Sequence, residues 1–353
     1  MSTRRPWLRP LVPVYAAAVS IKDALRGAGV LPTRALQWPV ISIGSLSAGG
    51  AGKTPVVIAL AKLLHESGWT VDVLSRGYGR TGRGIEQVRP GFDRSAERFG
   101  DEPMLIAEQT GVPVWVGANR FRAGERAEAA VSVNPRSAHL LDDGFQHRQL
   151  ARTIDIVLVT AEDLDDALLP AGNLRELPSA LLRADVVIVR ENEVRSESTA
   201  NGDAPAVGKR VWDLLREHGQ MWTVRRTLRF PAPLRVFGAG LRPVAFCAIA
   251  RPEDFAAMLQ EAGCGVIETV AFPDHHRYGR TDIDRVIEVA KSLNGSGFVT
   301  TEKDAVKLTS AMRERLEEVG PLMVGALEAE FADPHAVLRS LETKLLAVEV
   351  QAL

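Results

Sequence analysis

The stretch SAGGAGKT, which begins at Ser47, constrains the fold more than any other part of the chain. It follows WPVISIGSL, an apolar and β-branched run that predicts a buried strand. It leads into TPVVIALAKLLHESG, whose apolar spacing predicts a helix. A strand, a glycine-rich turn and a Lys-Thr pair at a helix start form a phosphate-binding loop, because backbone N–H groups and the helix N-terminus then surround a polyphosphate. A tight turn with an incidental Lys-Thr pair is the alternative.

The residues of this loop have separate tasks. Glycines bring backbone N–H groups close to the phosphates, Lys53 reaches the β- and γ-phosphates, and the Thr54 hydroxyl holds Mg²⁺. The strict pattern has glycine where this chain has Ser47, so the match is imperfect. We expect the nucleotide to be bound by Gly49, Gly50, Ala51, Gly52, Lys53 and Thr54.

Apolar strands alternate with amphipathic helices along most of the chain, which predicts an α/β fold with a parallel sheet covered on both faces. The phosphate loop makes this sheet NTPase-like. After a polar stretch, MWTVRRTLRF alternates like an extended ribbon, and a second α/β unit follows. We expect an amphipathic membrane-facing segment at 1–35, a phosphate-loop lobe at 36–220, a ribbon linker at 221–233, and a smaller α/β lobe at 234–353 whose C-terminal end could pack back on the first lobe.

Composition limits the class of protein. The 353 residues carry a formal net charge of -1 and are 46% apolar, so the chain can bury a core and has no global attraction for nucleic acid. Its cysteines, Cys247 and Cys264, form no CxxC pair and no disulfide framework, which favours a reducing compartment.

The N-terminus combines arginines with apolar residues, but Pro10 and Pro13 interrupt the apolar run. The run is too short to span a bilayer, which takes about 20 apolar residues. A helix packed on the core and a helix lying on a membrane surface both remain possible. The membrane-surface alternative is supported by the residues on one predicted helical face, which are Trp7, Leu8, Leu11, Val12 and Tyr15, with Arg4, Arg5 and Arg9 close by.

Acidic residues follow predicted strands at two places. The run AHLLDDG puts Asp142 and Asp143 at a strand end, where a carboxylate can complete a Mg²⁺ site with Thr54. We expect Asp143 to be the main metal partner, with Asp142 and Glu102 assisting, although both aspartates could be turn formers. Asp101 begins a predicted helix before Pro103 and could be only its N-cap.

The run FPDHHRY places Asp274, His275 and His276 in a predicted loop of the second lobe. A zinc site is one interpretation, but no third or fourth ligand is spaced nearby. A solvated loop is the other. Arginine forks suit phosphate oxygens, so Arg76 and Arg175 are candidate phosphate contacts unless they only form surface ion pairs.

Together these motifs resemble one family, the tetraacyldisaccharide 4'-kinases of lipid A synthesis. Each motif is weak alone, but their order and number are specific, and they span most of the chain. The set comprises GGAGKTP (Gly49–Pro55), SRGYGR (Ser75–Arg80), GDEP (Gly100–Pro103), DDGFQH (Asp142–His147), LLPAGNLRE (Leu168–Glu176), IARPEDF (Ile249–Phe255), FPDHH (Phe272–His276) and TTEKDAVKL (Thr300–Leu308).

The resemblance implies a kinase on the cytoplasmic face of the bacterial inner membrane. Such an enzyme transfers the γ-phosphate of ATP, with Mg²⁺, to the 4'-hydroxyl of a tetraacylated glucosamine disaccharide 1-phosphate. The resemblance also implies an Asp–His pair, which we assign to Asp101 and His275, with Lys53 as the third catalytic residue. We expect contacts with the substrate or its phosphates from Arg76, Arg120, Gln146, His147, Arg175 and Glu176.

Two other classes of protein stay open at this point. A membrane-associated partitioning or carrier ATPase uses a deviant phosphate loop, but Ala48 occupies the position of its signature lysine. A small-molecule kinase with a soluble substrate would not need the amphipathic N-terminus. Nothing in the sequence predicts a protein partner.

Overall fold

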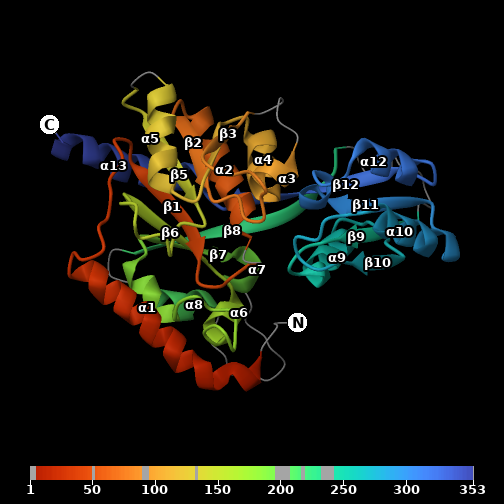
Figure 1. Cartoon of the computed structure of the whole chain (residues 1–353), viewed down its shortest axis with the longest axis horizontal. Coiled ribbons are helices and arrows are strands. Elements are labelled where there is room, and N and C mark those ends of the chain that lie inside the picture. Colours follow the sequence, from red (N-terminus) through yellow and green to blue (C-terminus); the bar gives the residue numbers. More distant parts are fainter. Residues whose placement is uncertain are drawn as a thin grey trace.

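A computed structural model describes residues 5–49, 52–89, 95–131, 134–194, 207–215, 219–231 and 242–352. Figure 1 shows two α/β bodies of unequal size, which we call the first and the second lobe. The first lobe contains the strands β1 (Val40–Ser45), β2 (Thr70–Ser75), β3 (Glu86–Val88), β4 (Val114–Val116), β5 (Ser137–Asp142), β6 (Ile154–Val159), β7 (Val186–Arg190) and β8 (Gln220–Arg229).

Helices cover both faces of the first-lobe sheet. They are η1 (Pro6–Leu11), α1 (Val12–Gly27), α2 (Lys53–Glu66), α3 (Ala96–Phe99), α4 (Asp101–Thr110), α5 (Arg120–Ala130), α6 (Ala161–Asp165), η2 (Pro178–Arg183), α7 (Glu191–Val194) and α8 (Val207–Trp212). The second lobe contains β9 (Pro243–Cys247), α9 (Pro252–Glu261), β10 (Glu268–Ala271), α10 (Arg280–Ser292), β11 (Gly297–Thr301), α11 (Glu302–Ala305), α12 (Ser310–Glu317) and β12 (Leu322–Phe331). The last helix, α13 (Pro334–Ala352), returns to the first lobe (Figure 1).

Within the described residues the strands form one twelve-stranded sheet, in the order β10-β9-β11-β12-β8-β7-β6-β1-β5-β2-β4-β3. Neighbours within each lobe run parallel, except for the edge pair β3–β4. The lobes join where β12 pairs antiparallel with β8, from Ala326 opposite Arg229 to Phe331 opposite Val224. The α/β fold with helices on both faces of a parallel sheet is therefore confirmed.

Successive side chains of each strand point to opposite faces of the first-lobe sheet, so an apolar core forms on each face. On β6, Ile156 and Leu158 pack against α2 and α13, while Val157 and Val159 face η2 and α8. At Gly44 a Cβ atom would lie 2.5 Å from the Cβ of Phe145, so only glycine lets the segment after β5 cross β1 so closely.

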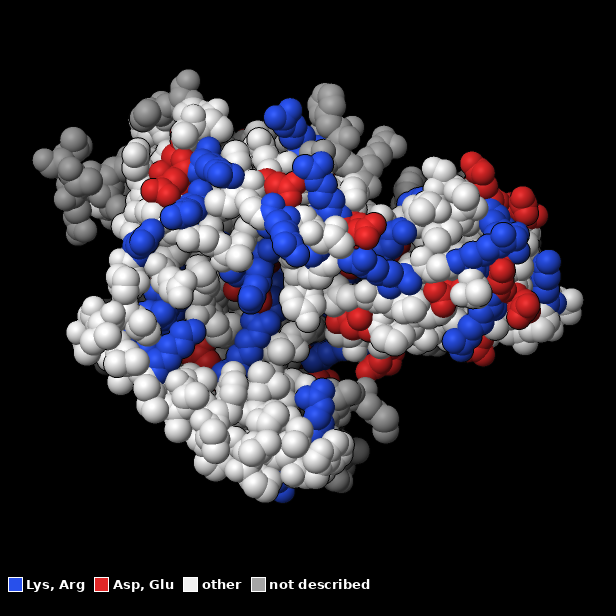
Figure 2. All heavy atoms as spheres, in the orientation of Figure 1, with Lys and Arg blue, Asp and Glu red and all other residues white. Residues whose placement is uncertain are grey.

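The N-terminal segment has two unlike faces. On α1 the half-buried side chains are Val12, Tyr15, Ala16, Val19, Asp23 and Arg26, and the first three of these pack on the η2 and α8 core. The opposite face exposes large apolar side chains, namely Trp7, Leu11, Val14, Ile21 and Leu25. Figure 2 shows this outer face as largely uncharged, with lysine and arginine side chains in the hollow between it and the body. Among the described helices, none is long and apolar enough to cross a membrane.

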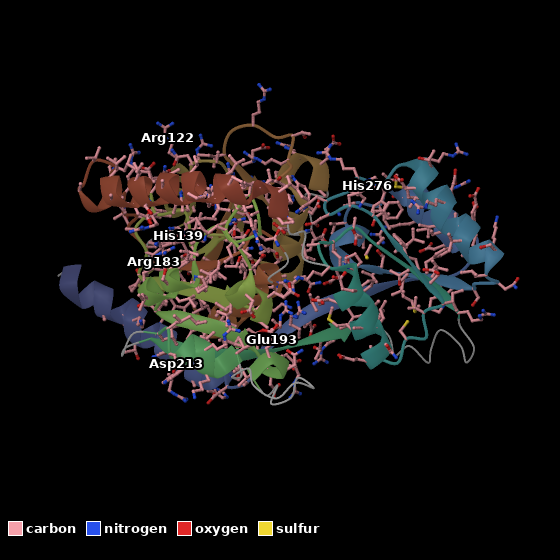
Figure 3. The ribbon with its side chains drawn as sticks, turned by 90° about the horizontal axis from the view of Figure 1, so that it is seen from below. Arg122, His139, Arg183, Glu193, Asp213 and His276 are labelled. Carbon is pink, nitrogen blue, oxygen red and sulfur yellow. The ribbon has the colours of Figure 1, made fainter. Side chains whose placement is uncertain are left out.

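A buried charged cluster lies on β5 at the end away from the phosphate loop. His139 is completely buried, its Nδ1 lies 2.7 Å from Asp72 and its Nε2 lies 3.3 Å from Glu128. Trp38 stacks on its ring (Figure 3 shows His139 inside the lobe). Burial alone would lower the pKa of His139, but the two carboxylates outweigh it and raise the pKa to about 9.

Replacing His139 with glutamine should therefore lower the free energy of unfolding by about 3 kcal/mol near pH 6, because two buried carboxylates lose their cation. In the wild type this contribution is complete below the ordinary histidine pKa of 6.5, and it is lost as the pH rises through about 9. Denaturant unfolding at several pH values tests both statements. A variant as stable as the wild type near pH 6 would contradict them.

Candidate active site

The phosphate loop lies between the carboxyl end of β1 and the start of α2, as the sequence predicts. Gly49 and Gly52 have φ angles of 81° and 85°, a left-handed conformation that favours glycine. Lys53 is the first residue of α2, and its Nζ lies 3.1 Å from Ser45 Oγ and 3.4 Å from Asp143 Oδ1. Gly50 and Ala51 lie outside the described residues.

The two aspartates after β5 have different surroundings, which the sequence does not distinguish. Asp143 has a φ of 49° and pairs with Lys53 and, at 2.8 Å, with Arg175. Asp142 is buried and accepts a 2.9 Å hydrogen bond from Ser75. Burial and the carboxylates of Glu102 and Asp143 raise the pKa of Asp142, so this corner has an excess of buried negative charge.

A second loop lies beside the phosphate loop and carries Arg175. The Arg175 backbone N–H donates to Leu46 O at 2.8 Å, and the Ala48 backbone N–H donates to Asn173 O at 2.9 Å. The Arg175 guanidinium also donates to Gln146 at 3.1 Å, and Gln146 in turn donates to Ser45 O at 3.0 Å. Arg175, Gln146 and the phosphate loop therefore form one network.

The other predicted substrate residues lie farther along this edge of the sheet. Arg76 is exposed, whereas Arg120 is only 6% exposed and its Nε has no hydrogen-bond partner. Burial and the nearby cations Arg120 and Arg152 lower the pKa of His147 to about 4, so it is neutral at pH 7. Glu176 is buried and pairs with Arg183 at 2.7 Å, which occupies its carboxylate within the protein.

Asp101 and His275 come together from opposite lobes. Asp101 begins α4 in the first lobe, and its Oδ2 lies 3.3 Å from His275 Nδ1 and 3.5 Å from Lys307 Nζ. Burial alone would raise the pKa of Asp101, but the hydrogen bond with His275 and the ammonium groups of Lys307 and Lys303 hold it below its usual range. His275 has a φ of 60°, and such strained positions are concentrated at functional sites.

Lysines of α11 and of the turn after it support this pair. Lys303 Nζ lies 3.4 Å from His275 Nε2 and 3.4 Å from Glu102 Oε1, so it joins the dyad to a predicted metal ligand. Lys307 is fixed by the buried Asp304 at 3.0 Å. Both lysines belong to the TTEKDAVKL motif, but the sequence alone predicts no role for either.

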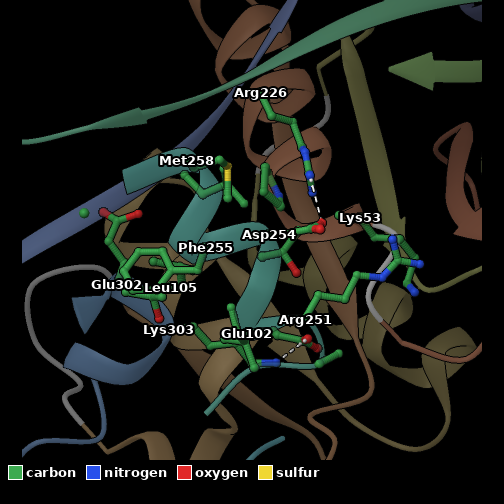
Figure 4. A pocket seen from close by; sticks show the side chains of 18 of the residues that line it. Lys53, Glu102, Leu105, Arg226, Arg251, Asp254, Phe255, Met258, Glu302 and Lys303 are labelled. Atoms are coloured by element: carbon green, nitrogen blue, oxygen red, sulfur yellow. Dashed lines mark hydrogen bonds and ion pairs between the residues drawn. The ribbon is translucent and has the colours of Figure 1, made fainter. Parts of the chain in front are cut away.

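A cleft between the lobes connects the dyad with the phosphate loop. Its walls include Lys53 and Thr54 on one side and His275 and Lys303 on the other. One part is apolar, with Leu105, Ile249, Phe255 and Met258, and apolar side chains of this kind suit the faces of a flat ring (Figure 4). Ion pairs flank this part: Arg226 with Asp254 at 3.2 Å and Arg251 with Glu162 at 2.7 Å. Sequence reasoning missed Arg226 and Asp254, since neither stands in a metal or phosphate motif.

The structure gives no support to zinc at the histidine pair. His276 turns away from His275, lies 3.0 Å from Asp282 and stacks on Phe272. Across the described ranges, no three histidine, cysteine or acidic side chains converge to hold a metal by themselves. For a nucleotide-bound Mg²⁺ the oxygen donors Thr54, Asp142 and Glu102 are nevertheless suitable, because phosphate oxygens and water complete its shell.

Comparisons with known proteins agree on one family. Residues 4–346 match the family described as tetraacyldisaccharide-1-P 4'-kinase. The tetraacyldisaccharide 4'-kinase of Koribacter versatilis is 37% identical over 338 residues, covering 94% of this chain and 96% of the relative. That of Gluconobacter oxydans is 34% identical, covering 96% and 98%. The crystal structure of LpxK from Aquifex aeolicus in complex with ATP has a TM-score of 0.72 and 28% identity, covering 97% of this chain and 98% of that one.

Removing the Lys53 ammonium in Lys53→Ala should leave the fold intact and abolish nucleotide turnover, because phosphoryl transfer depends on charge neutralisation and positioning. Turnover and thermal unfolding of the purified variant check the two halves of this statement. Normal turnover by a folded Lys53→Ala protein would exclude the phosphate-loop role.

Arg175→Ala should raise the KM for the acceptor or lower kcat, because it removes one of the two cations on Asp143 and the tie to Gln146. Arg210→Ala is a matched control, since Arg210 pairs with the exposed Asp165 on another part of the surface. Identical kinetics for the two variants would reduce Arg175 to a surface ion pair.

Proposed function

Because the chain belongs to the tetraacyldisaccharide 4'-kinase family, we infer that it transfers the γ-phosphate of ATP to the 4'-hydroxyl of a tetraacyldisaccharide 1-phosphate, a step of lipid A biosynthesis. One observation carries this proposal beyond family membership. The phosphate-loop Lys53 and His275, which Asp101 contacts from behind the cleft, line one cleft between the lobes, as transfer from a nucleotide to a hydroxyl requires.

ATP would lie with its phosphates on the loop and its base in the apolar part of the cleft, near Phe255 and Met258. Mg²⁺ fits the corner at Thr54, where Asp142 and Glu102 supply oxygen donors and unbalanced negative charge, and where Asp143 stands beside Asp142. When bound there, the ion would neutralise charge that develops on the phosphates. Asp143 meanwhile holds Lys53 and Arg175 beside the loop.

A sugar hydroxyl is a poor nucleophile, so a base must take its proton as the phosphoryl group moves. The dyad is suited to this task because Asp101 is ionised and His275 is oriented by it. Since one member comes from each lobe, the base is complete only when the lobes are together, which limits wasteful ATP hydrolysis. Arg76, Arg120, Gln146, His147 and Arg175 would line the acceptor's path, and Glu176 would act there through Arg183, which it holds.

We further propose that the enzyme works at the cytoplasmic face of the inner membrane. An acceptor with four acyl chains does not leave a bilayer freely, so the enzyme must reach it there. The apolar outer face of η1 and α1, with Trp7 73% exposed and Val14 67% exposed, suits the interface. Arg5 and Arg9 at its start could meet anionic head groups, worth about 1 kcal/mol each.

The reaction itself is tested by incubating the protein with [γ-³²P]ATP and tetraacyldisaccharide 1-phosphate in lipid vesicles. The expected product is a labelled lipid that carries a second phosphate, formed by the wild type and not by Lys53→Ala. Hydrolysis of ATP without a labelled lipid would contradict the proposed acceptor.

Deleting the residues before Ile21 should weaken binding to anionic vesicles. Because this deletion also removes Tyr15 and Val12 from the core, the paired substitutions Leu11→Gln and Val14→Gln are the sharper test. Both side chains are exposed, so vesicle sedimentation should fall while thermal stability is kept. Leu293→Gln, at an exposed apolar position of the second lobe, is the control. Unchanged sedimentation of the double variant would place the membrane contact elsewhere.

A further inference from the structure

Lys307 is a buried cation that contacts the dyad without lining the nucleotide cleft. Its side chain is only 5% exposed, and its Nζ lies 3.0 Å from Asp304 Oδ1 and 3.5 Å from Asp101 Oδ2. Among the described residues, Lys303 lines the cleft, whereas Lys307 lines a separate cavity that Asp101 also borders. A buried ammonium is costly unless carboxylates pair with it, and here one of the two carboxylates belongs to the dyad.

Asp304 holds the lysine in this place. Asp304 is fully buried, and its Oδ2 accepts hydrogen bonds from the Thr301 hydroxyl at 2.7 Å and from the Ala248 backbone N–H at 3.1 Å. Its other oxygen, Oδ1, accepts from Lys307. Thr301 ends β11 and Ala248 directly follows β9, so two strand ends fix the carboxylate that fixes the ammonium.

The same carboxylate reaches His275 by a second route. The Ala248 carbonyl oxygen accepts a hydrogen bond from the His275 backbone N–H at 3.3 Å. This support matters because His275 has a φ of 60°, which is uncommon for a residue with a side chain. Asp304 thus supports both members of the dyad, one through the lysine and the other through the end of β9.

Capping of α11 does not account for Lys307. The Thr301 hydroxyl caps this helix by accepting from the Asp304 backbone N–H at 3.1 Å, which requires no charge at position 307. Lys307 instead reaches across the lobes to Asp101 Oδ2, the oxygen that also lies 3.3 Å from His275 Nδ1. Two donors on one oxygen restrict the direction of the carboxylate more than one donor does.

We propose that Lys307, held by Asp304, is a positioning residue for the catalytic base. It fixes the Asp101 carboxylate against His275 Nδ1, so that the ring donates from Nδ1 and presents Nε2 to the cleft. This inference rests on the proposed function, because it assigns a task in that reaction to a residue that touches no substrate. Lys307 and His275 both belong to the second lobe, so moving that lobe away would remove both contacts from Asp101 at once.

The first test is Lys307→Met, which removes the ammonium and keeps an unbranched side chain. The kcat for lipid phosphorylation should fall about tenfold to a hundredfold, the usual contribution of a charged hydrogen bond. The KM values for ATP and the acceptor should stay within about twofold, because Lys307 contacts neither. Lys307→Arg, which keeps the charge, should recover part of kcat. Lys344→Met, which removes an ammonium paired with Asp185 at 2.7 Å on α13, should keep wild-type kinetics.

Combined variants separate a task through Asp101 from a merely structural one. In the Asp101→Ala background, Lys307→Met should cause no further loss of kcat, because no carboxylate is left to position. The double variant Asp304→Asn, Lys307→Met removes both buried charges, and the amide oxygen can still accept from Thr301 and Ala248. Thermal unfolding should show that this double variant regains stability that Lys307→Met alone loses, while its kcat stays low.

A wild-type kcat in folded Lys307→Met would overturn the inference, as it would in the neutral double variant if the single variant does not fold. Losses that multiply in the Asp101→Ala background, or a loss confined to KM, would also overturn it. Failure of the proposed function looks different. In that case the wild type forms no labelled lipid, or Asp101→Ala alone keeps the wild-type rate, and the inference falls with it.

Discussion

The antiparallel pairing of β8 with β12 determines how the whole molecule is arranged. The N-terminal part of β12 runs parallel to β11 in the second lobe, and its C-terminal part runs antiparallel to β8. The strands of the two lobes therefore point toward each other, and their carboxyl ends face the same cleft. Ligands of parallel sheets gather at carboxyl ends. One strand pair thus brings together two ligand-binding edges that either lobe alone would expose to solvent.

Ion pairs between side chains join the two facing edges. His275 meets Asp101, Lys303 meets Glu102, and Arg251 meets Glu162, and each pair joins one lobe to the other. Four of these side chains, His275, Lys303, Glu102 and Arg251, also line the cleft between the lobes. Contacts that shape the cleft and contacts that we propose to serve the reaction are therefore largely the same, so we expect nucleotide binding and lobe position to be linked.

Sequence reasoning succeeded where chemistry is local. The strand, glycines and Lys53 of the phosphate loop are adjacent in the chain, and the ordered motifs identify the family. It could not decide which of the Asp142 and Asp143 side chains points toward the phosphate loop, because the direction of each is set by the turn after β5, where Asp143 adopts a φ of 49°. It missed Lys307 and Arg226, whose partners Asp101 and Asp254 are distant in the chain. At the N-terminus one face of α1 packs on the first lobe, as one of the two alternatives predicts. The opposite face exposes apolar side chains, so contact with a membrane stays a proposal.

The proposed mechanism depends on one catalytic base that is assembled from two lobes. A double-mutant cycle on phosphate transfer to the lipid acceptor tests it most directly. If Asp101 and His275 act as a unit, then Asp101→Ala, His275→Ala and the double variant lose similar activity, because either single change already disables the pair. If the two losses multiply in the double variant, the residues act independently, and the account of a dyad closed across the cleft is wrong.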